Sequence, residues 1–299
     1  MKMLLQFPEG LKQKAFGEAD RLRKEGHQVY LSASPCYGAC DVALDEARAL
    51  KADKIIHYGH SEYLKEKPGI PVEYVEWKVD IPLQNLPALL PHLRGISKLA
   101  LATTVQHVHQ LPEISKFLEK NGIRVLIGKG CFAKYEGQVL GCDPLAALSV
   151  AKEADCILFV GTGKFHPTSI LPAKPVYSFD PFSKSFADLG PEIEKTRKRK
   201  KGALAGALGS KTFGILISTK PGQFCPGVAE WAKKELEERG RKAYILVSGE
   251  LNPLSLENFR KIECYINTAC PRLSEDTEMF GKPILNAVDL KELFELLGG

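Results

Sequence analysis

Eight cysteines give this 299-residue chain most of its potential for chemistry. In a long chain without a secretion signal, cysteines are more often metal ligands, reactive thiols or small core residues than parts of a disulfide framework. Met1 to Pro8 leads directly into a predicted core strand, so we expect no secretion signal and a reducing, cytoplasmic location. The first question is therefore which thiols could hold a metal.

Cys40 and Cys142 stand in matching sequence contexts, Tyr37-Gly38-Ala39-Cys40-Asp41 and Val139-Leu140-Gly141-Cys142-Asp143. Each cysteine precedes an aspartate that we expect to cap a helix. A thiolate at that position faces the positive end of the helix, which lowers the pKa of the thiol and favours iron binding. A third cysteine, Cys270, precedes a proline just after a predicted strand.

The remaining cysteines fit other roles. Cys156 and Cys264 lie inside predicted strands and are expected to be small core residues. Cys131 and Cys225 lie in predicted loops and could be near the site.

Cys36 and Cys40 could begin the Cys-x3-Cys-x2-Cys motif of ordinary radical enzymes, but Ala43 occupies its last position. Ligands more than a hundred residues apart carry no metal-spacing motif, so spacing alone supports a cluster on Cys40, Cys142 and Cys270 only weakly.

The elements that would position these cysteines form a threefold repeat of strand, helix, strand, helix, strand. The alignment is visible in residues, since Ala52-Asp53-Lys54-Ile55-Ile56 matches Ala154-Asp155-Cys156-Ile157-Leu158. In the third repeat Leu251 stands where the others have cysteine, and Cys270 comes one loop later. The expected strands are Met3 to Phe7, Val29 to Ser32, Ile55 to Tyr58, Leu99 to Thr103, Val125 to Ile127, Ile157 to Val160, Phe213 to Ile217, Ala243 to Val247 and Cys264 to Asn267.

Short apolar strands alternating with amphipathic helices predict an α/β fold of three homologous βαβαβ-type domains with parallel sheets. We expect domains at residues 1–90, 91–205 and 206–299, with Pro68 to Gly95 and Phe179 to Gly209 as crossings. Sites form at the carboxyl ends of such strands, and the three cysteines lie in loops there.

Composition excludes several classes of protein. The longest apolar stretches fall far below the ~18 residues of a membrane span. The net charge of +5 comes from 41 basic and 36 acidic residues, which is too mild and mixed to predict direct nucleic-acid binding. The basic run Lys195 to Lys201 is either a solvated helix or linker face, or a docking patch for an acidic partner or RNA.

Several segments together closely resemble the diphthamide biosynthesis family, in particular its archaeal homodimeric members, across all three repeats. The segments are Leu5-Gln6-Phe7-Pro8-Glu9-Gly10-Leu11, Tyr37-Gly38-Ala39-Cys40-Asp41, Tyr58-Gly59-His60, Gly137-Gln138-Val139-Leu140-Gly141-Cys142, Phe165-His166-Pro167 and Cys270-Pro271-Arg272-Leu273. The chain departs from the family pattern by starting almost at its first strand, without the expected lead-in, which bears on dimer geometry more than on chemistry.

The resemblance implies a pseudo-threefold arrangement around a 4Fe-4S cluster held by Cys40, Cys142 and Cys270, with the fourth iron open to S-adenosylmethionine. In this family, reductive cleavage gives methylthioadenosine and a 3-amino-3-carboxypropyl radical, which adds to C2 of a histidine in translation elongation factor 2. It also implies a homodimer and an electron donor, which the sequence does not identify.

Three further residues are candidates for binding S-adenosylmethionine or substrate. Gln223 could hold the methionine carboxylate or amine, or lie in a surface turn. His60 and His166 could contact substrate, or be loop histidines bonded to backbone.

Two other classes of protein stay open. Quinolinate synthase also surrounds a cluster with three pseudo-symmetric domains, but the Gln-Phe-Pro-Glu-Gly and Gly-Ala-Cys-Asp segments disfavour it. A non-catalytic accessory subunit bearing a cluster is the other, and the presence of all three cysteines favours activity.

Overall fold

Three sheets, one for each predicted repeat, organise the chain. The computed structural model describes residues 1–64 and 68–298. The chain divides into two compact units, Met1–Gly190 with the first two sheets and Pro191–Gly299 with the third. In the part of the chain that the structure describes, no helix is long and apolar enough to cross a membrane.

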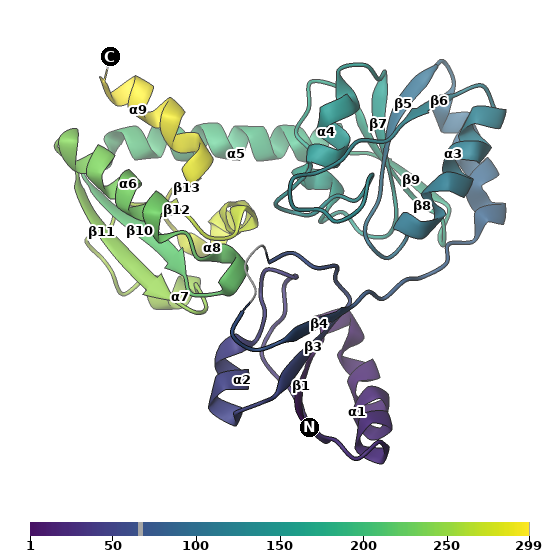
Figure 1. The fold of residues 1–299 in the computed structure, drawn as a ribbon. Coiled ribbons are helices and arrows are strands. Elements are labelled where there is room, and N and C mark those ends of the chain that lie inside the picture. Colours follow the sequence, from purple (N-terminus) through teal and green to yellow (C-terminus); the bar gives the residue numbers. More distant parts are fainter. Residues whose placement is uncertain (65–67, 299) are drawn as a thin grey trace. The chain divides into compact units, whose positions relative to one another are not determined.

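The first sheet has the strand order β2-β1-β3-β4, with all pairs parallel. Leu4 packs on the face covered by α2 and Leu5 on the face covered by α1, so helices cover both faces (Figure 1). The elements are β1 (Lys2–Gln6), η1 (Glu9–Lys14), α1 (Ala15–Lys24), β2 (Gln28–Leu31), α2 (Leu44–Leu50), β3 (Lys54–Tyr58) and β4 (Val72–Val75).

The second sheet has the order β6-β5-β7-β8-β9, and only the last pair is antiparallel. Leu99, Leu101 and Leu158 pack against α3 and η2, which contribute Ile114 and Leu89 among others. The elements are η2 (Leu83–Leu93), β5 (Lys98–Ala102), η3 (Val108–Gln110), α3 (Leu111–Lys120), β6 (Arg124–Leu126), α4 (Leu145–Ala151), β7 (Cys156–Val160), η4 (Pro167–Ser169), β8 (Val176–Asp180) and β9 (Ser185–Asp188).

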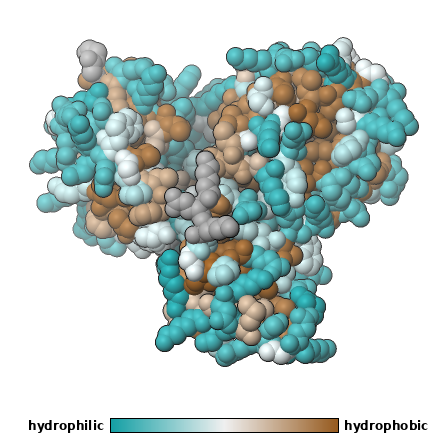
Figure 2. Space-filling view, viewed as in Figure 1, coloured by the Kyte–Doolittle hydropathy of each residue, from teal (hydrophilic) through white to brown (hydrophobic). Residues whose placement is uncertain are grey.

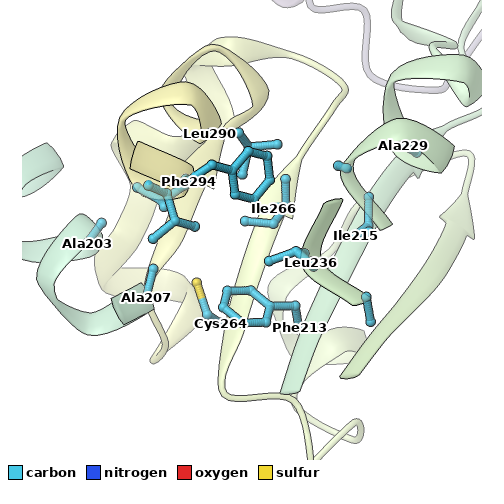
Figure 3. Close-up of a cluster of buried hydrophobic side chains, with 14 of the residues drawn as sticks. Ala203, Ala207, Phe213, Ile215, Ala229, Leu236, Cys264, Ile266, Leu290 and Phe294 are labelled. Carbon is cyan, nitrogen blue, oxygen red and sulfur yellow. The ribbon is translucent and has the colours of Figure 1, made fainter. Parts of the chain in front are cut away.

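The third sheet has the order β11-β10-β12-β13, again with all pairs parallel. Figure 3 shows one of its cores, in which Phe213 and Ile266 meet Leu236 and Phe294 of the covering helices. The elements are α5 (Gly190–Gly209), β10 (Thr212–Ser218), η5 (Pro221–Gln223), α6 (Pro226–Glu238), β11 (Lys242–Ser248), α7 (Pro253–Leu256), β12 (Cys264–Asn267), η6 (Pro271–Asp276), α8 (Thr277–Phe280), β13 (Ile284–Asn286), η7 (Ala287–Asp289) and α9 (Leu290–Gly298).

One acidic side chain per repeat ties the start of the first strand to the start of the third. Asp53 accepts a hydrogen bond from the backbone N–H of Lys2 at 2.6 Å, and Asp155 accepts from Lys98 at 2.9 Å. In the third repeat Glu263 accepts from Thr212 at 3.0 Å. These backbone bonds lower the pKa of Asp155 and of Glu263. The shared contact supports the threefold repeat read from the sequence.

The predicted α/β fold class is confirmed, since all nine expected strands form within about one residue of their predicted bounds. The two expected crossings contain regular secondary structure of their own. The first contains β4, and the second contains β9 and the helix α5, which carries the basic run Lys195–Lys201. The helix expected from Leu11 begins as the 3₁₀ helix η1 and becomes α-helical only at Ala15.

Candidate metal centre

Cys40 lies half-buried in the loop between β2 and α2. The buried amide of Gln6, at the carboxyl end of β1, holds this loop from two sides. Its Nε2 donates to the carbonyl of Asp41 at 2.6 Å, and its Oε1 accepts from the N–H of Ala43 at 3.0 Å. Gln6 thereby fixes the backbone that carries Cys40, a role that the sequence did not predict.

The predicted helix capping by Asp41 was wrong, whereas Asp143 Oδ1 does accept a hydrogen bond, at 3.2 Å, from the N–H of Leu145 at the start of its helix. Helix α2 begins at Leu44 with Ala43 as its N-cap, so Asp41 lies outside the helix. Helix α4 begins at Leu145 with Pro144 as its N-cap. Cys40 therefore lies further from the start of its helix than we expected.

Asp143 also organises the loop around Cys142. Its carboxylate is buried and accepts hydrogen bonds from the backbone N–H groups of Phe132 at 2.6 Å and Ala133 at 3.1 Å. A Cβ on Gly130 would lie 2.5 Å from Asp143 Oδ2, so glycine permits the close approach of the loop. The carboxylate therefore joins two ends of a loop that folds back over the sheet.

The loop after β3 contacts the Cys142 loop within the first compact unit. The hydroxyl of Tyr63 lies 3.9 Å from the Sγ of Cys142, and the Tyr63 ring stacks on Phe132 with centroids 5.3 Å apart. Gln138 Nε2 donates to Ser61 Oγ at 2.9 Å. The first and second repeats therefore meet at loops that carry predicted site residues.

A charged contact reinforces this junction. Glu76, just after β4, accepts hydrogen bonds from Lys134 and from the Tyr135 hydroxyl, both at 2.9 Å. Burial opposes ionisation of Glu76, but these donors outweigh it, and its pKa lies below the ordinary value.

Cys270 lies in the second compact unit, just after β12, where polar side chains fix the backbone. Asn267 Nδ2 donates to the Cys270 carbonyl at 2.7 Å, and Asn286 Nδ2 donates to the Pro271 carbonyl at 3.0 Å. Burial raises the pKa of the Cys270 thiol, while backbone hydrogen bonds from Arg272 and Leu273 act in the opposite direction. Those N–H groups would stabilise a metal-bound thiolate.

The other candidate residues are found in differing environments. His60 is paired with His57 across 2.9 Å between Nδ1 of His60 and Nε2 of His57. His166 is half-buried at the start of η4, where its carbonyl accepts from Ser169 Oγ at 2.7 Å. Gln223 is buried, so it does not lie in a surface turn.

Cys156 and Cys264 are core residues, as predicted. Both are fully buried in the strands β7 and β12, and burial raises the pKa of their thiols to about 11 and about 12. Figure 3 shows Cys264 among the apolar side chains of the third sheet. Cys131 and Cys225 are exposed in loops.

Three large apolar side chains of the second repeat are exposed. Leu145, Phe165 and Leu171 each expose more than a third of their surface. Figure 2 shows hydrophobic surface on this part of the chain.

In the basic run Lys195–Lys201, the side chain of Lys200 forms an ion pair with Asp289 at 2.7 Å.

Fold and site together define an α/β protein of three mostly parallel sheets with cysteines in loops at their carboxyl ends. The family model of the diphthamide synthesis protein matches residues 7–296. The chain is 35% identical to the 2-(3-amino-3-carboxypropyl)histidine synthase of Pyrococcus horikoshii, covering 100% of this chain and 90% of the relative. The chain belongs to the diphthamide synthesis protein family.

Other relatives agree. The Methanocaldococcus jannaschii synthase is 30% identical over 97% of this chain and 83% of its own length. Subunit 1 of the Homo sapiens synthase is 30% identical over 98% of this chain and 68% of its own length. The crystal structure of Dph2 from P. horikoshii with a 4Fe-4S cluster superposes with a TM-score of 0.89 and 35% identity, covering 99% of this chain and 86% of that one.

Proposed function

We propose that this chain is a transferase that moves the 3-amino-3-carboxypropyl group of S-adenosylmethionine to C2 of a histidine in translation elongation factor 2. The observation that carries the proposal is family membership along nearly the whole chain, residues 7–296. The names of the archaeal relatives state the transferred group and the acceptor residue.

Cys40, Cys142 and Cys270 are the proposed cluster ligands. When bound, a 4Fe-4S cluster with one open iron supplies the electron that cleaves S-adenosylmethionine into methylthioadenosine and an aminocarboxypropyl fragment. The surroundings of the proposed ligands suit a 4Fe-4S cluster, because hydrogen-bond donors lie near the thiols. The Tyr63 hydroxyl lies 3.9 Å from Cys142 Sγ. Backbone N–H groups also face the Cys270 thiol. Hydrogen bonds of this kind stabilise thiolate ligands.

The remaining residues of the chain would position the reactants. Gln6 and Asp143 hold the backbones that carry Cys40 and Cys142. Gln223 is proposed to bind the methionine moiety of S-adenosylmethionine, and His60 and His166 to lie near the cosubstrate or the acceptor histidine. Correct alignment selects which carbon–sulfur bond breaks.

The assembly is proposed to be a homodimer of chains with domains at residues 1–90, 91–205 and 206–299, working in the cytoplasm with a separate electron donor. Light scattering on the anaerobic protein is expected to give twice the mass of the chain. A monomer that retains full activity would contradict the dimer.

The transfer is tested with unmodified elongation factor 2, a chemical reductant and S-adenosylmethionine labelled in the aminocarboxypropyl group. Mass spectrometry should find the label on one histidine of the factor. A matched reaction with Cys142→Ala should leave the factor unlabelled, and the Cys131→Ala variant should label it normally. Label elsewhere on the factor, or none with a loaded cluster, would contradict the proposal.

A further inference from the structure

Three potential metal ligands meet at the carboxyl end of the first sheet, apart from the proposed cluster ligands. Cys36 lies in the loop after β2, His57 on β3, and His60 two residues beyond that strand. The sulfur of Cys36 and one ring nitrogen from each histidine all lie within 4.8 Å of one another. Among the described residues, this is the group of cysteine, histidine and acidic side chains close enough together to surround a single ion.

Hydrogen bonds fix which nitrogen of His57 faces this group. Gln6 Oε1 accepts from the Ala43 N–H while Gln6 Nε2 donates to the Asp41 carbonyl, so the orientation of the amide is determined. Nδ1 of His57 lies 2.9 Å from Oε1, which can only accept, so Nδ1 carries the proton. Nε2 of His57 therefore presents a lone pair towards His60. A carbonyl oxygen behind the distal N–H is the usual support of a metal-bound histidine.

Burial keeps the two rings in the form that binds metal. Burial lowers the pKa of His57 to about 3 and that of His60 to about 4, so both are neutral near pH 7. Repulsion between the two rings when both are protonated lowers the pKa of His57 further. The Tyr74 ring from β4 packs against His57 with centroids 5.3 Å apart and shields it. Cys36 is also buried, with 4% of its surface exposed.

We propose that Cys36, His57 and His60 form a second metal site that binds a single Zn²⁺ ion. One thiolate and two imidazoles suit Zn²⁺, which takes such ligands at about 2.0 to 2.3 Å in tetrahedral geometry. Two nitrogens bound to one tetrahedral Zn²⁺ ion lie roughly 3.3 Å apart, so the histidine nitrogens, which are 2.9 Å apart, would have to separate by only a few tenths of an ångström. Three protein ligands leave the fourth position open to water or a small solute.

Binding of Zn²⁺ to this site would release one proton. Without metal, His60 Nδ1–H donates to His57 Nε2. When Zn²⁺ binds to Nδ1, this proton moves to Nε2 of the same ring, and the Cys36 thiol loses its proton. One Zn²⁺ ion is taken up and one proton is released, leaving the thiolate, two neutral imidazoles and the metal.

The ion would also join elements around Cys40. Cys36 precedes Cys40 by four residues, and Gln6 contacts both His57 and the backbone after Cys40. A bound ion would therefore fix the Cys40 loop to β3. The site shares His60 with the residues proposed to lie near S-adenosylmethionine, but none of its ligands is a proposed cluster ligand. Metal binding can therefore be tested separately, in a chain without the cluster ligands.

The test uses the full-length chain carrying Cys40→Ser, Cys142→Ser and Cys270→Ser, which removes the proposed cluster ligands. Titration with Co²⁺, a spectroscopic substitute for Zn²⁺, should give one equivalent of tetrahedral cobalt with a thiolate-to-cobalt absorption band. Adding Zn²⁺ should abolish the band. In the same chain, a further Cys36→Ser substitution should abolish the thiolate band, and a further His57→Gln substitution should abolish stoichiometric cobalt binding.

Two further variants complete the test: a control without the exposed thiols and a substitution of Gln6, which supports His57. Cys131→Ser with Cys225→Ser removes the two exposed thiols and should leave the band unchanged. Gln6→Met should weaken binding roughly 10- to 100-fold, as loss of a supporting partner does. If the folded chain that retains Cys36 shows no thiolate band, the proposal is overturned. This result does not require the Cys36→Ser variant to fold. Persistence of the band in a folded Cys36→Ser variant would overturn it equally. Zinc counted beside iron in the wild-type holoprotein should approach one per chain.

Discussion

The hydroxyl of Tyr63 lies 3.9 Å from the Sγ of Cys142, which brings a donor from the first repeat to a proposed ligand in the second. A hydrogen bond to a thiolate ligand stabilises the more negatively charged reduced form of a cluster. Tyr63→Phe should therefore lower the reduction potential of the bound cluster without loss of iron. A net bond of about 1 kcal/mol corresponds to roughly 40 mV for one electron.

This shift is measured by redox titration followed by electron paramagnetic resonance. Tyr30→Phe is the matched control, because the Tyr30 hydroxyl bonds only to Gln28 among the hydrogen bonds described for it, at 2.6 Å. An unchanged potential in the Tyr63 variant, with iron content equal to wild type, would show that the contact does not tune the cluster.

The proposed ligands are tested by iron content. Cys40→Ala, Cys142→Ala and Cys270→Ala should each reduce cluster loading severely, because a cluster loses one of its three protein bonds. Cys156→Ala should leave iron near the wild-type level, since its thiol is buried in the core. Full iron after loss of any two of the three ligands would make the assignment wrong.

Gln6 is expected to contribute strongly to stability. Gln6→Met would leave the buried ring N–H of His57 and the partly buried backbone N–H of Ala43 without their acceptor. An unsatisfied buried polar group costs about 1 to 3 kcal/mol, so the free energy of unfolding in urea should fall by that order. Gln28→Met, on the exposed start of β2, should have little effect.

Acid stability should depend on the carboxylates that hold the strand starts. The pKa of Asp155 is lowered in the folded chain, so its contribution is present above its ordinary value of 3.8 and lost as pH falls through the lower folded value. Asp155→Asn should therefore flatten the pH dependence of unfolding in this acid range. Asp45→Asn, on an exposed helix position, should leave the slope unchanged.

Repeats and strands could be predicted because apolar periodicity reports burial on each sheet. The fourth strand of each sheet was missed, since segments such as Val72–Val75 are short, only partly buried and carry no repeated motif. Residues that act through tertiary contacts were also missed. Gln6 bonds to the Asp41 carbonyl, beside Cys40, across 35 residues of sequence, and Tyr63 meets Cys142 across 79. Local sequence patterns carry no information at such separations.

The central claim is tested most directly by the products formed from S-adenosylmethionine alone. The chain, loaded anaerobically with iron and sulfide and reduced chemically, should yield methylthioadenosine with products of a quenched aminocarboxypropyl fragment. Chromatography of the Cys40→Ala variant under the same conditions should show unreacted S-adenosylmethionine. Deoxyadenosine and methionine as the main wild-type products would contradict the proposed bond cleavage. Unreacted S-adenosylmethionine beside a fully loaded, reduced cluster would contradict catalysis and favour an accessory role.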